Sequence, residues 1–242
     1  MKDVLNRRRS ASLTFYATVP SACGYLDSRS SVNLFADPAK PMTMELYSRL
    51  ADYGFRRNGE YVYRPRCPTC DECIPLRVPV AQFAPNRSQR RTWQRNAGLE
   101  ITRLPAGYRA EHFDLYRRYI STRHAGSGMD TADPASYRHF INSSWAQTWL
   151  YEFRERGALK AVAVVDELSQ GLSAVYTFFD PREAKRGLGT YAILWEIEET
   201  RRLGYSWLYL GYWIADSPKM RYKTAFEPVE AYRSGRWQPF TP

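Results

Sequence analysis

The sequence has no apolar run long enough to cross a membrane. A transmembrane helix needs about 18 consecutive apolar residues, whereas the longest runs here have the length of a strand, as at 161–165. Arginines at 7–9 precede the segment 13–19 and a cysteine, as in a lipoprotein signal, but Thr14 and Pro20 are among the residues that interrupt it. We therefore expect a soluble, cytoplasmic protein with no membrane partner.

Cysteine is also scarce: the chain has four, three of them within seven residues. This pattern fits a reduced compartment better than a disulfide framework. Two-residue gaps let neighbouring thiolates converge on one metal at about 2.3 Å, and the upstream cysteine would complete a tetrahedral site. The predicted ligands of a zinc ion or iron–sulfur cluster are Cys23, Cys67, Cys70 and Cys73. The alternative is a set of buried or redox-sensitive thiols without a metal.

Acidic residues are fewer than basic ones. Asp and Glu number 25 against 35 Lys and Arg, which gives a net charge of +10, and aromatic residues reach 15%. Cationic side chains displace counterions from a phosphate backbone, and aromatic rings stack on unpaired bases. This composition favours a polyanionic partner such as RNA, although a basic surface that only keeps the protein soluble would also explain the charge.

The first third of the sequence contains short predicted elements. Alternating residues predict a strand at 13–19, and apolar residues at helical spacing predict a helix near 44–50 that ends at Gly54. A strand is predicted at 74–80, in an edge position, because Pro75 and Pro79 cannot donate hydrogen bonds. Pro85 and Asn86 interrupt the pattern, so we divide the chain into domains 1–85 and 86–242.

The remainder of the chain predicts an α+β fold. Helices are expected at about 109–124 and 136–147, followed by an antiparallel meander of strands at 149–155, 159–168 and 172–179. A glycine turn, a helix with Glu196, Glu198 and Glu199 facing outward, and a strand at 207–212 complete the order. This order is typical of a mixed sheet with helices of the N-acetyltransferase (GNAT or Fem) type, on which the cysteine-containing N-terminal subdomain would pack.

Two basic segments are candidates for contact with phosphate. The turn before the predicted helix can hold an anion with its backbone N–H groups and the helix dipole, although a tight turn alone would also need glycine; its residues are Lys185, Arg186, Gly187 and Gly189. Upstream, arginines at three- and four-residue steps would share one side of a helix. These are Arg87, Arg90, Arg91 and Arg95, and a solvated helix face is the alternative.

Several sequence motifs resemble the arginyl-tRNA–protein transferase family over nearly the whole chain. The first half carries CGYL at 23–26, LFADP at 34–38 and YRP at 63–65. The second half carries RSQRR at 87–91, SAVYTFF at 173–179, RGLGTY at 186–191 and YLGYWI at 209–214. The length and these motifs are most similar to the short bacterial branch of the family, which places leucine on proteins that begin with Asp or Glu.

The resemblance implies an aminoacyltransferase of the N-degron protein-degradation pathway. It would move leucine, or else arginine, from aminoacyl-tRNA to an N-terminal α-amine, with no cofactor needed for the chemistry. Since the ester is already activated, positioning, removal of a proton from the amine and stabilisation of the oxyanion suffice. The predicted catalytic residues are His124, Asp130, Tyr176 and Tyr212, and the predicted cationic clamp for the acceptor is Arg66, Lys219, Arg221 and Lys223.

Two other functions fit the same patterns. An ordinary N-acetyltransferase would take its acyl group from acyl-CoA rather than from tRNA. A non-catalytic RNA-binding protein would use the cysteines to sense metal or oxidation.

Overall fold

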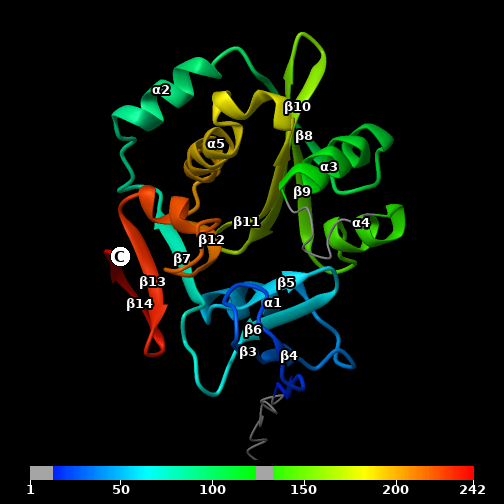
Figure 1. Ribbon diagram of the computed structural model, residues 1–242, viewed down its shortest axis with the longest axis vertical. Helices are drawn as coiled ribbons and strands as arrows, with labels where there is room; N and C mark the ends of the chain where they lie inside the picture. The colour runs from blue at the N-terminus through cyan, green and yellow to red at the C-terminus, as the bar shows by residue number, and fades with distance from the viewer. Residues whose placement is uncertain (1–12, 124–132) are drawn as a thin grey trace, which may run out of the picture.

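The computed structural model describes residues 13–123 and 133–242. At one end of the molecule, a four-stranded antiparallel sheet in the order β1-β4-β6-β5 packs beside helix α1 (Figure 1). The bounds are β1 Phe15–Ala17, β4 Asn33–Ala36, α1 Met44–Asp52, β5 Arg56–Asn58 and β6 Tyr61–Pro65, with a small β2–β3 pair at Ser21–Ala22 and Ser30–Ser31. The strand expected at 13–19 and the helix expected near 44–50 are therefore present, as β1 and α1.

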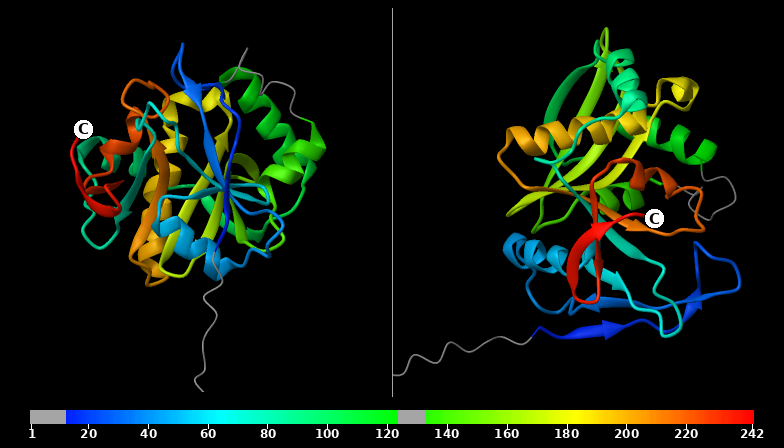
Figure 2. Two further views of the ribbon diagram at one scale, coloured as in Figure 1. Left: turned by 90° about the horizontal axis from the view of Figure 1, so that it is seen from below. Right: turned by 90° about the vertical axis from the view of Figure 1, so that its left-hand side faces the viewer.

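An eight-stranded sheet forms the other end, in the order β14-β13-β7-β12-β11-β10-β9-β8 (Figure 2). Its strands are β7 Ile74–Pro79, β8 Glu100–Pro105, β9 Gln147–Glu155, β10 Ala158–Leu168, β11 Gly171–Phe179, β12 Trp207–Trp213, β13 Val229–Arg233 and β14 Arg236–Phe240. Neighbours run antiparallel except β11 and β12, which are parallel. The α+β class and the predicted meander β9-β10-β11 are confirmed.

Helices cover both faces of the large sheet. Alternate residues of β10 point to opposite faces, so Ala163 packs in the cluster that contains α5 (Leu188–Arg202), while Val162 packs with α3 (Ala110–Arg123) and α4 (Pro134–Ile141). Helix α2 (Arg87–Arg95) lies against α5, where the rings of Trp93 and Tyr191 are 5.3 Å apart. Within the described residues, none of the helices is long and apolar enough to span a bilayer.

Helix α4 is shorter than predicted. Asp133 caps its first turn and Asn142 ends it, so residues 142–146 are not helical. The hydroxyl of Ser144 instead donates to Glu60 Oε2 at 3.0 Å, and its backbone N–H donates to Glu60 Oε1 at 2.7 Å. These bonds hold the segment against the small sheet, which is a tertiary contact that helical spacing cannot reveal.

The edge position predicted for β7 is wrong, because this strand lies between β12 and β13. It pairs with β12 over its whole length but with β13 only at Leu76 and Arg77, between the two prolines. A short contact on one side therefore accommodates Pro75 and Pro79 inside the sheet. The division at residue 85 stays a prediction, but the chain already enters the large sheet at Ile74.

A buried ion pair joins the two sheets. Arg57 of β5 donates to both carboxylate oxygens of Asp166 on β10, from Nε and Nη2 at 2.7 Å each, and to Thr148 Oγ1 at 3.0 Å. Both charged side chains are fully buried. The hydroxyl of Tyr47 on α1 also donates to Asp166, at 3.2 Å. Buried polar groups at each end of the molecule thus find their hydrogen-bond partners at the other end.

Candidate functional site

The parallel strands β11 and β12 separate after three residue pairs. Gly171 to Ser173 pair with Trp207 to Tyr209, and beyond Ser173 no described strand pairs with β11 on that side. The register slips by one residue at Val175, where β11 meets β10, and at Leu210, where β12 meets β7. Residues 174–177 of β11 are partly exposed, whereas 171–173 are buried. We call this opening the β11–β12 split.

Arg56 lies at the narrow end of the split. Its Nη2 donates to the carbonyl of Ala174 at 2.7 Å, and its Nη1 lies 3.5 Å from the carbonyl of Tyr209. Gly211 makes room for the guanidinium, since a Cβ there would lie 3.0 Å from Arg56 Cζ, and its φ of +74° also favours glycine. Among the residues described, no carboxylate forms an ion pair with Arg56.

Lys223, predicted to bind the acceptor, lies near Arg56. It is half-buried on the 3-10 turn Arg221–Ala225, and its Nζ donates to the carbonyl of Tyr212 at 2.6 Å. Burial, aided by the charge of Arg56, lowers the pKa of Lys223 to about 7. A large fraction of this amine is therefore neutral at pH 7, which suits it to accept a proton.

The predicted catalytic tyrosines lie on the two strands of the split. The hydroxyl of Tyr212 donates to the carbonyl of Gly54 at 2.9 Å, and burial raises its pKa well above the usual value. Tyr176 on β11 is half-buried among aromatic rings, with that of Phe140 5.3 Å away, and burial raises its pKa too. Both phenols stay protonated near neutral pH. His124 and Asp130 lie outside the described residues.

Glu196 on α5 is buried rather than outward-facing as predicted. Its exposed fraction is 0%, and within the described part of the chain neither carboxylate oxygen has a hydrogen-bond partner. Burial raises the pKa of Glu196 to about 8, and the positive charge of Arg56 opposes that shift. The prediction failed because Glu196 follows Ile193 by three residues and precedes Ile197, which places it on the inner face of the helix.

The glycine turn is built into the N-terminus of α5. Gly187 adopts a left-handed conformation with φ of +71°, and a Cβ at Gly189 would lie 3.2 Å from the ring of Phe179. Arg186 forms ion pairs with Glu155 and Glu183, at 3.1 and 3.3 Å, whereas Lys185 is exposed. The turn thus has structural reasons for its glycines, and its contact with phosphate stays a prediction.

The four arginines of α2 are exposed, as predicted. Asn86 and Gln89 form a capping box that starts the helix. Arg95 donates to the carbonyl of Lys185 at 2.7 Å, and Arg90 donates to that of Pro85. The structure therefore links Arg95 to the glycine turn, so that the two predicted phosphate-binding segments lie side by side.

The cysteines are near one another but do not form a ready metal site. Burial raises the pKa of Cys73 to about 12, and the nearby Cys67, Cys23 and Cys70 add to this shift. Cys67 Sγ accepts from the N–H of Val32 at 3.4 Å. Within the described residues, no three His, Cys, Asp or Glu side chains are placed closely enough to hold a metal. Metal binding by these thiols remains a prediction.

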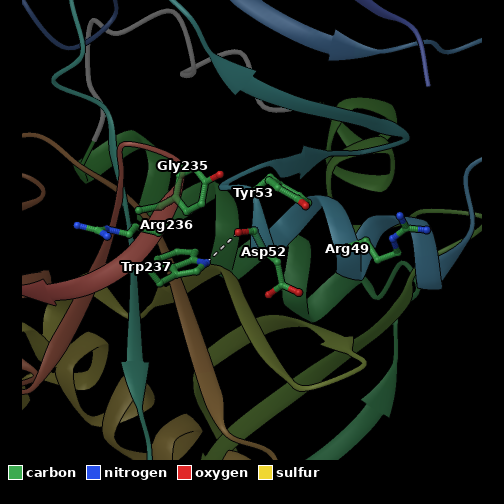
Figure 3. A pocket seen from close by; sticks show the side chains of 7 residues that line it. Arg49, Asp52, Tyr53, Gly235, Arg236 and Trp237 are labelled. Carbon is green, nitrogen blue, oxygen red and sulfur yellow. Dashed lines mark hydrogen bonds between the residues drawn. The ribbon is translucent and has the colours of Figure 1, made fainter. Parts of the chain in front are cut away.

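The other predicted acceptor-binding cations, Arg66, Lys219 and Arg221, are exposed. A separate hollow of about 350 Å³ lies between the end of α1 and the β13–β14 hairpin (Figure 3). Arg49 and Arg236 lie at its rim, and the indole N–H of Trp237 donates to the carbonyl of Asp52 at 2.8 Å. None of the predicted site residues lines this hollow.

Comparison with known proteins covers both ends of the molecule. Residues 21–91 match the N terminus of arginine-tRNA-protein transferase, and residues 111–233 match its C terminus. The chain belongs to this family. The family resemblance seen in the sequence is therefore confirmed. Strand β7 falls in the first match and its neighbours β12 and β13 in the second, so the two family regions share one sheet.

Similar proteins extend over nearly the full length. An aspartate/glutamate leucyltransferase from Nitrosococcus oceani is 54% identical over 92% of this chain and 94% of its own. Another from Chromobacterium violaceum is 50% identical over 94% of each chain. Among solved structures, L-PGS from Bacillus licheniformis is 12% identical, covers 70% of this chain and 49% of its own, and has a TM-score of 0.46. That score is too low to support an argument.

Sequence reasoning missed Arg56 and misplaced Glu196 and Glu199, since Glu199 is buried as well and pairs with Arg202 at 2.6 Å. One signal was available for the first: in the pair Arg56-Arg57, successive strand residues point to opposite sides of the sheet, so the two guanidinium groups had to have different surroundings. Nothing in the sequence indicated that one would meet a carboxylate and the other the backbone of the split.

Proposed function

We propose that this protein transfers leucine from leucyl-tRNA to the N-terminal α-amine of proteins that begin with Asp or Glu, marking them for the N-degron pathway. The observation that carries this is the match to aspartate/glutamate leucyltransferases at 54% identity over 92% of the chain. Family membership over both regions accounts for the use of charged tRNA. The exposed arginines of α2 supply a surface for its phosphates.

The order of elements supports an acetyltransferase-like catalytic fold of the GNAT or Fem type. A meander β9-β10-β11 leads through α5 to β12, which is parallel to β11 and leaves it after three residue pairs. A split between parallel strands exposes backbone N–H and C=O groups that a neighbouring strand would otherwise occupy. In the proposed reaction the aminoacyl end of the tRNA enters there.

The chemistry replaces an ester bond by an amide bond. The neutral α-amine of the acceptor attacks the carbonyl carbon of the leucyl ester, and the ribose oxygen leaves with a proton. Backbone N–H groups of β11 beyond Ser173, where the pairing with β12 ends, would stabilise the oxyanion. Lys223, with its lowered pKa, would accept the proton of an α-ammonium group, whose pKa is about 8, with His124 and Asp130 as the sequence-based alternatives. Tyr212 or Tyr176 would return a proton to the leaving oxygen.

The cysteines are proposed to have a structural or regulatory role. Thiolates of Cys23, Cys67, Cys70 and Cys73 would bind zinc or an iron–sulfur cluster and so tie the loop after β2 to the loop before β7. The aminoacyl transfer itself needs no metal, because the ester is already activated.

A direct transfer assay tests the function. The purified protein is incubated with radiolabelled leucyl-tRNA, arginyl-tRNA or acetyl-CoA and with peptides that begin with Asp, Glu, Arg or Ala. We expect label from leucyl-tRNA on the Asp and Glu peptides only. Label from acetyl-CoA instead would identify an N-acetyltransferase, and tRNA binding without transfer to any peptide would identify an RNA-binding protein; either result would overturn the proposal.

A further inference from the structure

Arg56 and Arg57 are neighbours on β5 with opposite surroundings. Arg57 is fully buried and its charge is neutralised by Asp166 through two bonds of 2.7 Å. Arg56 is half-buried, and its described acceptors are only the carbonyls of Ala174 and Tyr209. A half-buried cation without an anion is costly unless a ligand supplies the missing charge.

The guanidinium of Arg56 retains donors for such a ligand. It carries five N–H groups, and two of them are directed at backbone carbonyls of β11 and β12. These two contacts fix the plane of the group across the split. The remaining N–H groups match the two oxygens of a carboxylate, which binds guanidinium in a bidentate manner.

The position of Arg56 favours the acceptor over the RNA as its ligand. Ala174 lies five residues before Phe179 along β11, a distance of about 16 Å at roughly 3.3 Å per residue, and the basic turn that carries Lys185 lies beyond Phe179. The predicted phosphate contacts are thus at the other end of the strand. Arg56 instead lies near Lys223, because its guanidinium packs against Gly211 and Lys223 Nζ donates to the carbonyl of the next residue, Tyr212. It is therefore near the proposed site of the α-amine.

We propose that Arg56 binds the side-chain carboxylate of the acceptor's N-terminal Asp or Glu and thereby determines the specificity for acidic acceptors. This inference rests on the proposed function and names the residue that selects its acceptor. Lys223 meets the α-amine while Arg56 meets the carboxylate, so one N-terminal residue is held at two points. A neutral Asn or Gln at the same place would leave the guanidinium without its anion.

The test compares peptides that differ only in their N-terminal residue, Asp against Asn and Glu against Gln. We expect Arg56→Gln to lower kcat/KM for the Asp and Glu peptides by about 10- to 100-fold, as for loss of a charge-assisted hydrogen bond, and to change the Asn and Gln values little. Arg56→Lys should retain part of the preference. Affinity for leucyl-tRNA should stay within about twofold of the original.

Arg64→Gln is the matched control. Arg64 lies on β6 of the same sheet and donates to the backbone carbonyl of Tyr53 at 2.7 Å rather than to a carbonyl of β11 or β12, so this variant should keep the preference. Thermal unfolding of each variant separates misfolding from altered selection. An equal loss for acidic and neutral peptides, or a loss confined to leucyl-tRNA binding, would overturn the inference. Failure of the unsubstituted protein to modify any Asp or Glu peptide would instead refute the proposed function.

Discussion

Glu196 makes stability depend on pH in an unusual direction. A buried carboxyl with a pKa near 8 is neutral in the folded protein at pH 7 but ionised in the unfolded chain. Since the folded pKa is raised, the free energy of unfolding should fall as pH rises from about 4.5 to about 8. Glu196→Gln should remove this dependence and stabilise the protein at pH 8 by roughly 1–3 kcal/mol.

Urea unfolding at pH 5 and pH 8 measures this effect. Glu198→Gln on the exposed side of the same helix, where the carboxylate pairs with Arg201 at 2.6 Å, is the control and should change stability by less than about 1 kcal/mol. Parallel pH profiles for the original and the Glu196 variant would show that the carboxylate is ionised in the folded state.

At the scale of elements, the Arg57–Asp166 pair adds a buried polar contact to the apolar cluster between the small sheet and the large one. Arg57→Met leaves the Asp166 carboxylate buried without its partner and should destabilise the protein by about 3–5 kcal/mol. Adding Asp166→Leu should recover only part of that loss, because the unpaired charge is removed but the hydroxyls of Tyr47 and Thr148 lose their acceptor. Chemical denaturation of the two single variants and the double variant gives the interaction energy between Arg57 and Asp166. If the losses in unfolding free energy are additive, the two charges do not stabilise each other.

At the scale of the whole molecule, the net charge of +10 should strengthen tRNA binding mainly through the arginines of α2. Arg90→Glu with Arg91→Glu should weaken tRNA binding and reduce the slope of log K against log salt concentration by roughly 1.5, as expected for two lost phosphate contacts. The control variant, Arg233→Glu with Arg236→Glu on the β13–β14 hairpin, changes the net charge by the same amount. Filter-binding titrations over a range of salt concentrations should show a smaller loss of tRNA affinity for the hairpin variant than for the α2 variant. An equal loss would mean that the net charge matters and its position does not.

Local patterns in the sequence were enough for the long helices and for the strands β1, β7, β9, β10, β11 and β12, but not for β8, β13 or β14. The strand-like run at 159–168, with turns at Gly157 and Gly171, predicts β10, and the glycines at 187 and 204 delimit α5, because each reflects the preferences of its own residues. Neighbours in the sheet were harder to predict. Nothing near Pro75 indicates that β13, some 150 residues later, will pair with β7 on one side only, and nothing near Arg56 indicates that its acceptors are on β11 and β12.

The interior position of β7 has a consequence for how this protein can be divided. A gene cut at residue 85 would yield a C-terminal polypeptide in which β12 and β13 have lost the strand between them. The bare edge of β12 would then be open to association with other chains. Truncation experiments must therefore keep β7 with the C-terminal half. The same strand argues against an origin of this family by fusion of two independently folding domains.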